Sequence, residues 1–366
     1  AGSALSGITL RDIGGLNVGS VGGQTGLKTT NSMIDITSDG HLTLLDMIDS
    51  GTGITRLTTT NGGNLTQAGG EILADFLAFQ SAGVADLSDP NNAVGTVAGM
   101  SAGSMTIVDS DGLLIHTVAG LNGLTTVNSP ISVQAGGTLE LMETINSGSA
   151  RTRLATMSGG SITQSMGALE ADGFEFNASG DVFVSQTGND FDAVAGTAVG
   201  VINLFNAAPL RVTTVGSESG LTAGGSNITI QSVGTLTLDE HVDIPGGRLL
   251  IQTVAGGVDQ TGGSLTADGM AFNAQGPVTL LQQENNLNVV NGIAQGAIRI
   301  VDTNELTVGA VPNPFSIAPG LSSGGQPIEI TADGDLMITE RVVAANSQIS
   351  LTTDNGGTIS QTSFGQ

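Results

Sequence analysis

The chain has 366 residues, 39% of them hydrophobic, and a formal net charge of −24 at neutral pH. This composition excludes a disordered polar tail, and the charge argues against nucleic acid and anionic membrane surfaces as partners, because both attract basic patches. The absence of cysteine excludes disulfides, thiolate-bound zinc and thiol catalysis.

The first segments of the chain alternate apolar and polar residues and are separated by turn residues. Ile-Asp-Ile at 34–36 and Leu-Thr-Leu at 42–44 are followed by Ser-Asp-Gly at 38–40 and Asn-Gly-Gly at 61–63 in the same part of the chain. Alternation with period two predicts strands with one buried face, and Asp-Gly and Asn-Gly supply the positive φ of tight turns. With 56 glycines and a single lysine, helices are disfavoured, and we expect an all-β protein.

The strongest signal is self-similarity with a period of about 97 residues. A segment ending in glutamine recurs at intervals of 97, 96 and 101 residues, at Gln67, Gln164, Gln260 and Gln361. Four further columns follow the first three glutamines at constant distances: Asp75, Asp172 and Asp268; Phe79, Phe176 and Phe272; Gly83, Gly180 and Gly276; Asn92, Asn189 and Asn285. Segments 8–18, 105–115, 202–212 and 298–308 also superpose without gaps.

These columns predict one elongated array over 1–366 rather than separate domains. Its repeat units are 1–97, 98–194, 195–290 and 291–366, the last of them incomplete. An open solenoid end is an exposed strand edge. We therefore expect the chain to continue in a longer protein or to join end to end with another copy.

Coiling the strands, so that each turn lies on the one before, gives every strand a parallel neighbour. A rung of about 20 residues gives four or five rungs per unit and about 18 in all, and parallel crossovers favour the right-handed sense. We therefore predict a right-handed parallel β-helix, or β-solenoid. The alternative is four antiparallel β-sandwich domains, but the chain has no Trp or Tyr for a sandwich core and no Pro-rich linkers.

Short recurring segments of the sequence resemble those of a known family. The Gly-Ser/Asn-Ile/Leu-Thr-Gln segments, Ala-Ser-Gly-Asp-Val at 178–182 and Gly-Asn-Asp-Phe at 188–191 resemble filamentous-haemagglutinin-type repeats and the β-strand repeats of large bacterial secreted proteins. The resemblance extends over the whole chain and implies a right-handed β-helix, a bacterial source, secretion, and a role in adhesion or matrix. It transfers no functional residue.

An acidic column is the best candidate for carbohydrate chemistry, which needs paired carboxylates. Its members are Asp46, Glu143, Glu240 and Glu340. They stand a whole unit apart, about 20–25 Å along the coil axis, so they cannot act together. We interpret the column as a solvated or turn-facing position repeated by duplication, and we expect no catalytic residue and no cofactor-binding residue.

Calcium is the one cofactor that the acidity suggests. Residues 109–112, Asp-Ser-Asp-Gly, resemble the start of a calcium loop, but the closing glutamate is missing, so we interpret them as a turn. No metal site with converging ligands is expected. The candidate residues for weak binding of Ca²⁺ at the surface are Asp46, Asp49, Asp239, Glu240 and Asp243.

Other polar columns are given structural interpretations. The aspartates at 75, 172 and 268 are expected to be buried or turn-capping carboxylates, and the glutamine column to bond backbone groups at a corner. His41, His116 and His241 fall at three different places in the repeat, which predicts exposed strand or turn histidines rather than a metal site.

The sequence thus favours a non-catalytic structural component of a bacterial extracellular fibre, sheath or matrix. Its expected partners are other copies of itself, with a surface glycan or protein as a further option and no nucleic acid. No apolar run is long enough to cross a membrane. The alternatives are an adhesin stalk and, more remotely, a carbohydrate-active enzyme acting through Glu143 or Glu240. The small insertion near 312–327 is the feature that bears on an adhesin.

Overall fold

The computed structural model describes residues 1–362, and in this range it contains strands and no helix. The chain divides into two compact units, Ala1–Gly180 and Asp181–Gln366, and we describe each by itself. The division falls inside the second predicted repeat unit.

The strands of the first unit are short, and most have three to twelve residues. They are β1 (Gly2–Ala4), β2 (Ile8–Asp12), β3 (Leu16–Val18), β4 (Leu27–Thr29), β5 (Ile34–Ser38), β6 (Leu42–Leu44), β7 (Ile48–Thr59), β8 (Leu65–Gln67), β9 (Ile72–Ser81), β10 (Ala85–Leu87), β11 (Ala93–Ser101), β12 (Met105–Asp109), β13 (Leu113–Ile115), β14 (Thr117–Val118), β15 (Leu121–Asn122), β16 (Leu124–Thr126), β17 (Ile131–Ala135), β18 (Leu139–Leu141), β19 (Ile145–Thr156), β20 (Ile162–Gln164) and β21 (Leu169–Ala178).

The second unit is built in the same way. Its strands are β22 (Val182–Val184), β23 (Asp190–Ala198), β24 (Ile202–Asn206), β25 (Leu210–Val212), β26 (Thr214–Val215), β27 (Glu218–Ser219), β28 (Leu221–Ala223), β29 (Ile228–Ser232), β30 (Leu236–Leu238), β31 (Val242–Thr253), β32 (Val258–Gln260), β33 (Leu265–Ala274), β34 (Val278–Leu280), β35 (Asn286–Ala294), β36 (Ile298–Asp302), β37 (Leu306–Val308), β38 (Leu321–Ser323), β39 (Ile328–Ala332), β40 (Leu336–Ile338), β41 (Val342–Ala344), β42 (Ile349–Thr353) and β43 (Ile359–Gln361).

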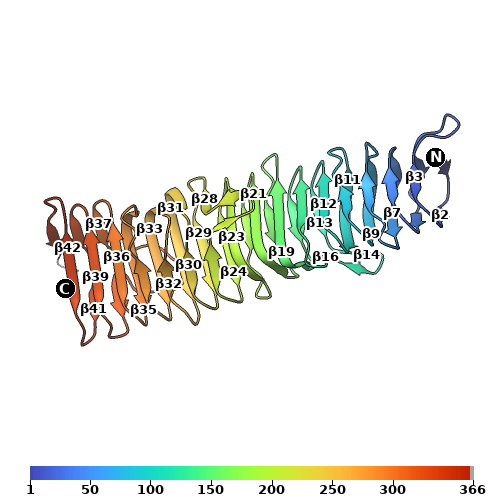
Figure 1. Ribbon diagram of the computed structural model, residues 1–366. Helices are drawn as coiled ribbons and strands as arrows, with labels where there is room; N and C mark the ends of the chain where they lie inside the picture. Colours follow the sequence, from blue (N-terminus) through green and yellow to red (C-terminus); the bar gives the residue numbers. More distant parts are fainter. Residues whose placement is uncertain (363–366) are drawn as a thin grey trace. The chain divides into compact units, whose positions relative to one another are not determined.

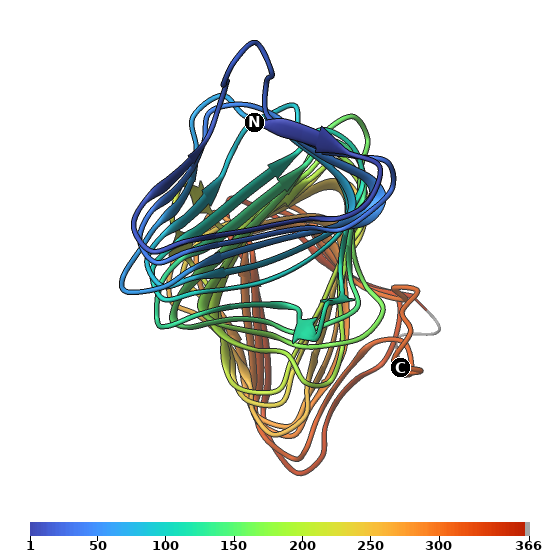
Figure 2. The ribbon, with the colours of Figure 1, turned by 90° about the vertical axis from the view of Figure 1, so that its right-hand side faces the viewer.

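Within each unit the chain winds in coils, and each strand pairs in parallel with the strand above it. In the first coils β1 pairs with β4, β2 with β5 and β3 with β6, so that three stacks of strands form. Neighbouring strands lie side by side in Figure 1, and Figure 2 shows the coils of the first unit, in blue to green, as closed loops. The predicted all-β parallel solenoid is confirmed, and the parallel ladders rule out antiparallel sandwich domains. The right-handed sense stays a prediction.

The interior of the coils is filled by stacked aliphatic and phenylalanine side chains. In β5 the inward residues Ile34 and Ile36 are fully buried, while the alternating residues Asp35 and Thr37 are partly exposed, as period-two alternation requires. The predicted column Phe79, Phe176 and Phe272 is fully buried as well. These side chains account for most of the favourable free energy of folding, since burial of an aliphatic or aromatic side chain contributes about 1.5–3 kcal/mol.

One sequence repeat does not correspond to a whole number of coils. Met105 occupies the place in the repeat that Ile8 occupies one unit earlier, yet the two lie in different stacks. The stack that reaches Met105 starts at Leu16, in the strand after Ile8, and runs through Leu42, Leu65 and Ala85, at steps of 26, 23, 20 and 20 residues. A given position in the repeat therefore moves along the solenoid by four coils and one further strand from one repeat unit to the next.

The second unit shows the same offset. Ile298 is the counterpart of Ile202 in the sequence repeat, but it continues the stack that begins at Leu210. That stack runs through Leu236, Val258 and Val278. Features that recur in the sequence are therefore carried to the next of the three stacks at each repeat.

Candidate functional site

In the first unit, a hairpin of β14 and β15 leaves the coil and lies on its outer surface. Val118 pairs with Leu121 across the hairpin, and Val118 is buried against Ala78 and Ala98. Ile54 completes the cluster. The small alanine side chains leave room for the hairpin on a strand face that would otherwise be exposed, so the hairpin acts as a lid.

The second unit carries a short lid and a long one. The short lid is the hairpin of β26 and β27. The long one is residues 309–320, in which Val311 is buried with Leu250 and Ala271, and Phe315 packs against them. This segment contains most of the predicted insertion near 312–327 and includes three prolines. It contains no strand, because proline cannot supply the backbone donor that a hairpin ladder needs.

Three members of the acidic column accept a hydroxyl from the coil before them, from the turn between β3 and β4 in the case of Asp46 and from a lid in the case of Glu143 and Glu240. The hydroxyl of Ser20 donates to Asp46 at 2.6 Å, that of Thr117 donates to Glu143 at 3.1 Å, and that of Thr214 donates to Glu240 at 3.5 Å. Each donor stands 26 residues before its acceptor. This agrees with the interpretation of a turn-facing position.

The fourth member of the column, Glu340, lacks such a donor at the equivalent place. Ala310 stands there and has no hydroxyl. The Glu340 N–H donates to the carbonyl of Val308 at 3.3 Å, and the N–H groups of Asp46 and Glu240 make the same bond to Val18 and Val212. The long lid is therefore held by its apolar contacts rather than by the carboxylate.

Two of the calcium candidates are engaged by basic side chains. Asp49 accepts from Lys28 Nζ at 2.5 Å, and Asp239 accepts from Arg211 Nε and Nη2 at 2.9 and 2.6 Å. Asp243 lies in β31 beside Thr222 and Thr266. In the part of the chain that the structure describes, no group of three or more His, Asp or Glu side chains is arranged to hold a metal ion. Calcium binding at these residues stays a prediction.

Gln67 and Asn92 form a reciprocal pair of amide hydrogen bonds in the first unit. Gln67 Nε2 donates to Asn92 Oδ1 at 2.7 Å, and Asn92 Nδ2 donates to Gln67 Oε1 at 3.0 Å. Asn92 Oδ1 also accepts the Ile72 N–H at 2.8 Å, and Gln67 Nε2 donates to the Gly70 carbonyl at 2.7 Å. The pair thus satisfies backbone groups of a corner that no ladder reaches.

The second unit repeats this arrangement with Gln260 and Asn285. Their two amide bonds measure 2.7 and 2.9 Å, and Asn285 Oδ1 accepts the Leu265 N–H at 3.0 Å. The predicted role of the glutamine column in bonding backbone at a corner is confirmed at Gln67 and Gln260. What the sequence analysis missed is that the recurring asparagine is the partner of the glutamine.

Asp109, at the end of β12, is a buried carboxylate. Its Oδ1 accepts the Val94 N–H at 2.8 Å and its Oδ2 accepts the Asp111 N–H at 3.1 Å. Burial, with the neighbouring Asp111 carboxylate adding to it, raises the pKa of Asp109 to about 7. The turn expected at 109–112 is present, but its first side chain points inward rather than to solvent.

Asp302 occupies the same place at the end of β36 in the second unit. Its oxygens accept the N–H groups of Leu287 at 2.7 Å and Asn304 at 3.0 Å, and burial raises its pKa to about 6. Asn206 stands at this place at the end of β24, where its Oδ1 accepts the Phe191 N–H at 2.9 Å. A neutral amide therefore fits the position as well as a carboxylate does.

A second buried carboxylate of the first unit, Glu175, was not found by the sequence analysis. Its side chain is 1% exposed, with Oε2 3.0 Å from Arg151 Nη1 and Oε1 3.4 Å from Arg153 Nε. The equivalent residue one repeat earlier is Ala78. This charge occurs in one repeat unit alone, so no recurring column marks it in the sequence.

The aspartate column at 75, 172 and 268 was interpreted incorrectly. All three side chains are exposed, not buried or turn-capping, because they lie on the outward side of the long strands β9, β21 and β33. Asp268 accepts from Asn288 Nδ2 at 3.2 Å. Of the histidines, His41 is exposed as expected and accepts the Asn64 N–H at 3.0 Å, while His116 is half-buried, with Nδ1 3.9 Å from Glu143.

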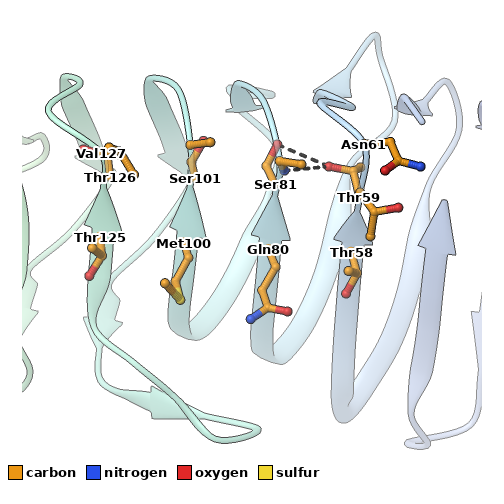
Figure 3. Close-up of a pocket in the computed structure, with 13 residues that line it drawn as sticks. Thr58, Thr59, Asn61, Gln80, Ser81, Met100, Ser101, Thr125, Thr126 and Val127 are labelled. Carbon is orange, nitrogen blue, oxygen red and sulfur yellow. Dashed lines mark hydrogen bonds between the residues drawn. The ribbon is translucent and has the colours of Figure 1, made fainter. Parts of the chain in front are cut away.

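A groove of about 450 Å³ lies on the outer face of the first unit, over β7, β9, β11 and β16. Figure 3 shows a row of side chains across it, Thr58, Gln80, Met100 and Thr125, which the strand register places side by side. Met100 is 47% exposed. The lining contains no ionisable side chain, so it offers no acid, base or charged ligand.

Comparisons with models of known families, with curated proteins and with solved structures found no match. The part of the chain that the structure describes contains no helix that could span a membrane. What the fold and the recurring polar groups define is a class, the repetitive parallel β-solenoids.

Proposed function

We propose that this protein is a non-catalytic structural component of an extracellular fibre, sheath or matrix of a bacterium. In this proposal its coils form a rod that belongs to a longer chain or assembles end to end with other copies. The bacterial and extracellular setting rests on the resemblance to filamentous-haemagglutinin-type repeats.

One observation carries the proposal: recurring glutamines and asparagines, and three members of the acidic column, take part in bonds within the chain. Gln67 and Asn92 bond each other and the backbone, and Asp46 and Glu143 accept the hydroxyls of Ser20 and Thr117. Recurrence of these residues is explained by the architecture, with no ligand needed to account for it. A repeated coil that is bonded in this way suits a load-bearing or spacing role.

Electron microscopy of the native material, with and without a calcium chelator, tests the proposal. Coils spaced about 4.8 Å apart, advancing four coils and one strand per sequence unit, predict filaments with an axial period near 21 Å. A given position of the repeat returns to the same one of the three stacks after three sequence repeats, so filaments should also show a period near 62 Å. Dissolution by the chelator would assign the acidity to cation bridging, and compact particles without axial order would contradict the structural role.

An adhesin stalk is the second candidate, and residues 309–320 favour it. This lid differs in length and sequence from the hairpins, as an added recognition segment would. Binding of the protein to a cell-surface or glycan panel, lost when 309–320 is replaced by residues 213–220, would support this function. Binding unchanged by the replacement would remove the observation on which it rests.

A further inference from the structure

A corner of the first unit presents an Asn-Gly pair to solvent. Asn61 and Gly62 lie between β7 and β8, both exposed, with φ values of 48° and 75°. The turn is closed by the Gly63 N–H, which donates to the Thr60 carbonyl at 2.9 Å. The Gly62 N–H has no acceptor among the described residues, and no atom lies within 4 Å of where a Cβ of Gly62 would stand.

The second unit has the same corner at Asn355 and Gly356. Their φ values are 51° and 80°, both residues are exposed, and the Gly357 N–H closes the turn onto the Asp354 carbonyl at 3.0 Å. Again no neighbour lies where a Cβ of Gly356 would be. In both corners the asparagine amide donates to an aspartate of the preceding coil, Asn61 to Asp39 at 2.6 Å and Asn355 to Asp333 at 2.5 Å.

Two other Asn-Gly pairs of the chain are held differently. Asn291 is 1% exposed inside β35, and the N–H of Gly292 donates to the Gly320 carbonyl at 2.8 Å. At the base of the first lid, the Gly123 N–H donates to the His116 carbonyl at 3.3 Å, and Asn122 Oδ1 accepts the Thr117 hydroxyl. In both pairs the glycine nitrogen is already hydrogen-bonded.

We propose that Asn61 and Asn355 are sites of spontaneous deamidation, and that the fold directs this modification to them. The nitrogen of the following glycine attacks the asparagine Cγ, and ammonia leaves, so that a cyclic succinimide forms. Water then opens the ring at either carbonyl, giving aspartate or isoaspartate. One water is consumed and one ammonia released at each site, with no oxidant, reductant or enzyme.

Three features of the corners favour the reaction. The glycine nitrogen is not engaged in a hydrogen bond, the absence of a Cβ leaves its approach open, and the exposed turn can change conformation without disturbing a ladder. At Asn291 the same chemistry requires β35 to leave its sheet, and opening of a core strand is rare.

The product has a consequence for the corner. A carboxylate at position 61 would stand at hydrogen-bond distance from the carboxylate of Asp39, where the amide donated before. Like charges at this separation repel, and the amide bond to Asp39 is lost, while the Thr60 hydroxyl still donates to the Asp39 carboxylate. Deamidation therefore loosens the corner and adds one negative charge per site.

The test is incubation of the full chain at mildly alkaline pH, with peptide mass spectrometry and isoaspartate detection at all four pairs. A free peptide spanning 58–65 gives the rate without the fold. We expect product at positions 61 and 355 at least about tenfold faster than at 291, because opening a core strand costs more than the ~1.4 kcal/mol that a factor of ten represents. Equal rates at all four pairs would overturn the proposal, as would intact Asn61 and Asn355 after the free peptide has reacted.

Asn61→Ser and Asn355→Ser are the matched controls. Ser158 stands at the equivalent corner, with φ 51° before Gly159 at 77°, so serine is compatible with this turn. The serine variants should lose the slow gain of negative charge seen on ion exchange. Amide exchange at 60–63 should rise with incubation in the parent chain and stay constant in Asn61→Ser. A rise of equal size in both would show that the corner loosens for another reason.

Discussion

Phe79 and Gly99 are paired in register on β9 and β11, and the phenylalanine ring occupies the space that a side chain at 99 would need. A Cβ at residue 99 would lie 2.2 Å from Phe79 Cζ. In the second unit Gly292 has the same relation to Phe272, at 2.4 Å. The large and the small residue are thus two parts of one packing unit that bridges neighbouring coils.

Gly99→Ala should destabilise the chain by about 1–3 kcal/mol, because the added methyl overpacks a fully buried ring. The unfolding midpoint in guanidinium, followed by circular dichroism, measures the effect. Gly19→Ala is the control, since its Cβ would make ordinary contact with Leu45 at 3.6 Å. Equal midpoints for Gly99→Ala and Gly19→Ala would show that the ring can move aside.

Asn92→Ala should cost about 2–4 kcal/mol, because it leaves the Ile72 N–H without its acceptor in a buried corner and removes both amide bonds between Asn92 and Gln67. Asn91→Ala is the control, since Asn91 is exposed. A double-mutant cycle with Gln67→Ala should give a coupling of about 1 kcal/mol or more. Additive effects would mean that the two amides act independently of each other.

Asp109 should make stability depend on pH. Its pKa is raised from 3.8 to about 7 in the folded chain, so the folded state holds the proton more tightly than the unfolded state. Stability from this group is therefore highest below about pH 4, falls as pH rises towards 7 and is constant above.

Asp109→Asn should flatten this decline and raise stability at pH 8 by on the order of 1–3 kcal/mol, because the amide carries no charge to be buried. Asn206 shows that an amide fits the equivalent place. Thermal melts between pH 4 and 8 measure the pH dependence of stability in the parent chain and in Asp109→Asn. Asp75→Asn, at an exposed position, is the control. A decline as steep as in the parent chain would exclude Asp109 as its source, leaving groups such as Asp302.

The ion pairs of Glu175 should respond asymmetrically to mutation. Removing both Arg151 and Arg153 leaves a carboxylate in a site where its side chain is 1% exposed, which should cost about 3 kcal/mol or more. Glu175→Ala should cost less, because the arginines are 45% and 29% exposed and regain water. Equal losses in urea denaturation would contradict this account.

Asn291→Ala should stabilise the second unit by about 1 kcal/mol. Its Oδ1 is buried without a partner in the described chain. The equivalent residue of the first unit is Ala98, which is also buried beneath a lid. Differential scanning calorimetry measures the shift in melting temperature. A loss of stability would indicate that a water molecule under the lid bonds this oxygen.

Much of the fold followed from local pattern. The alternation Ile34-Asp35-Ile36 predicted a strand with one buried face, and the turn residues at 61–63 predicted a corner, because both depend on backbone preferences of a few adjacent residues. The recurring Gln67 was correctly given a structural role. Its partner Asn92 was not recognised, since nothing local links two residues 25 positions apart.

The sequence by itself determined that the chain is all-β, that its strands stack in parallel and that certain columns recur, because these follow from periodicity. Only the tertiary structure decided which strand lies on which. Met105 reaches the stack of Leu16 rather than that of Ile8 because the lengths of all the intervening strands and turns add up to four coils and one strand. Asp109 is buried because it shares the inward face of β12 with Met105 and Ile107. Asp75 faces solvent because it stands where the alternation of β9 breaks, a break that the packing of the coils decides.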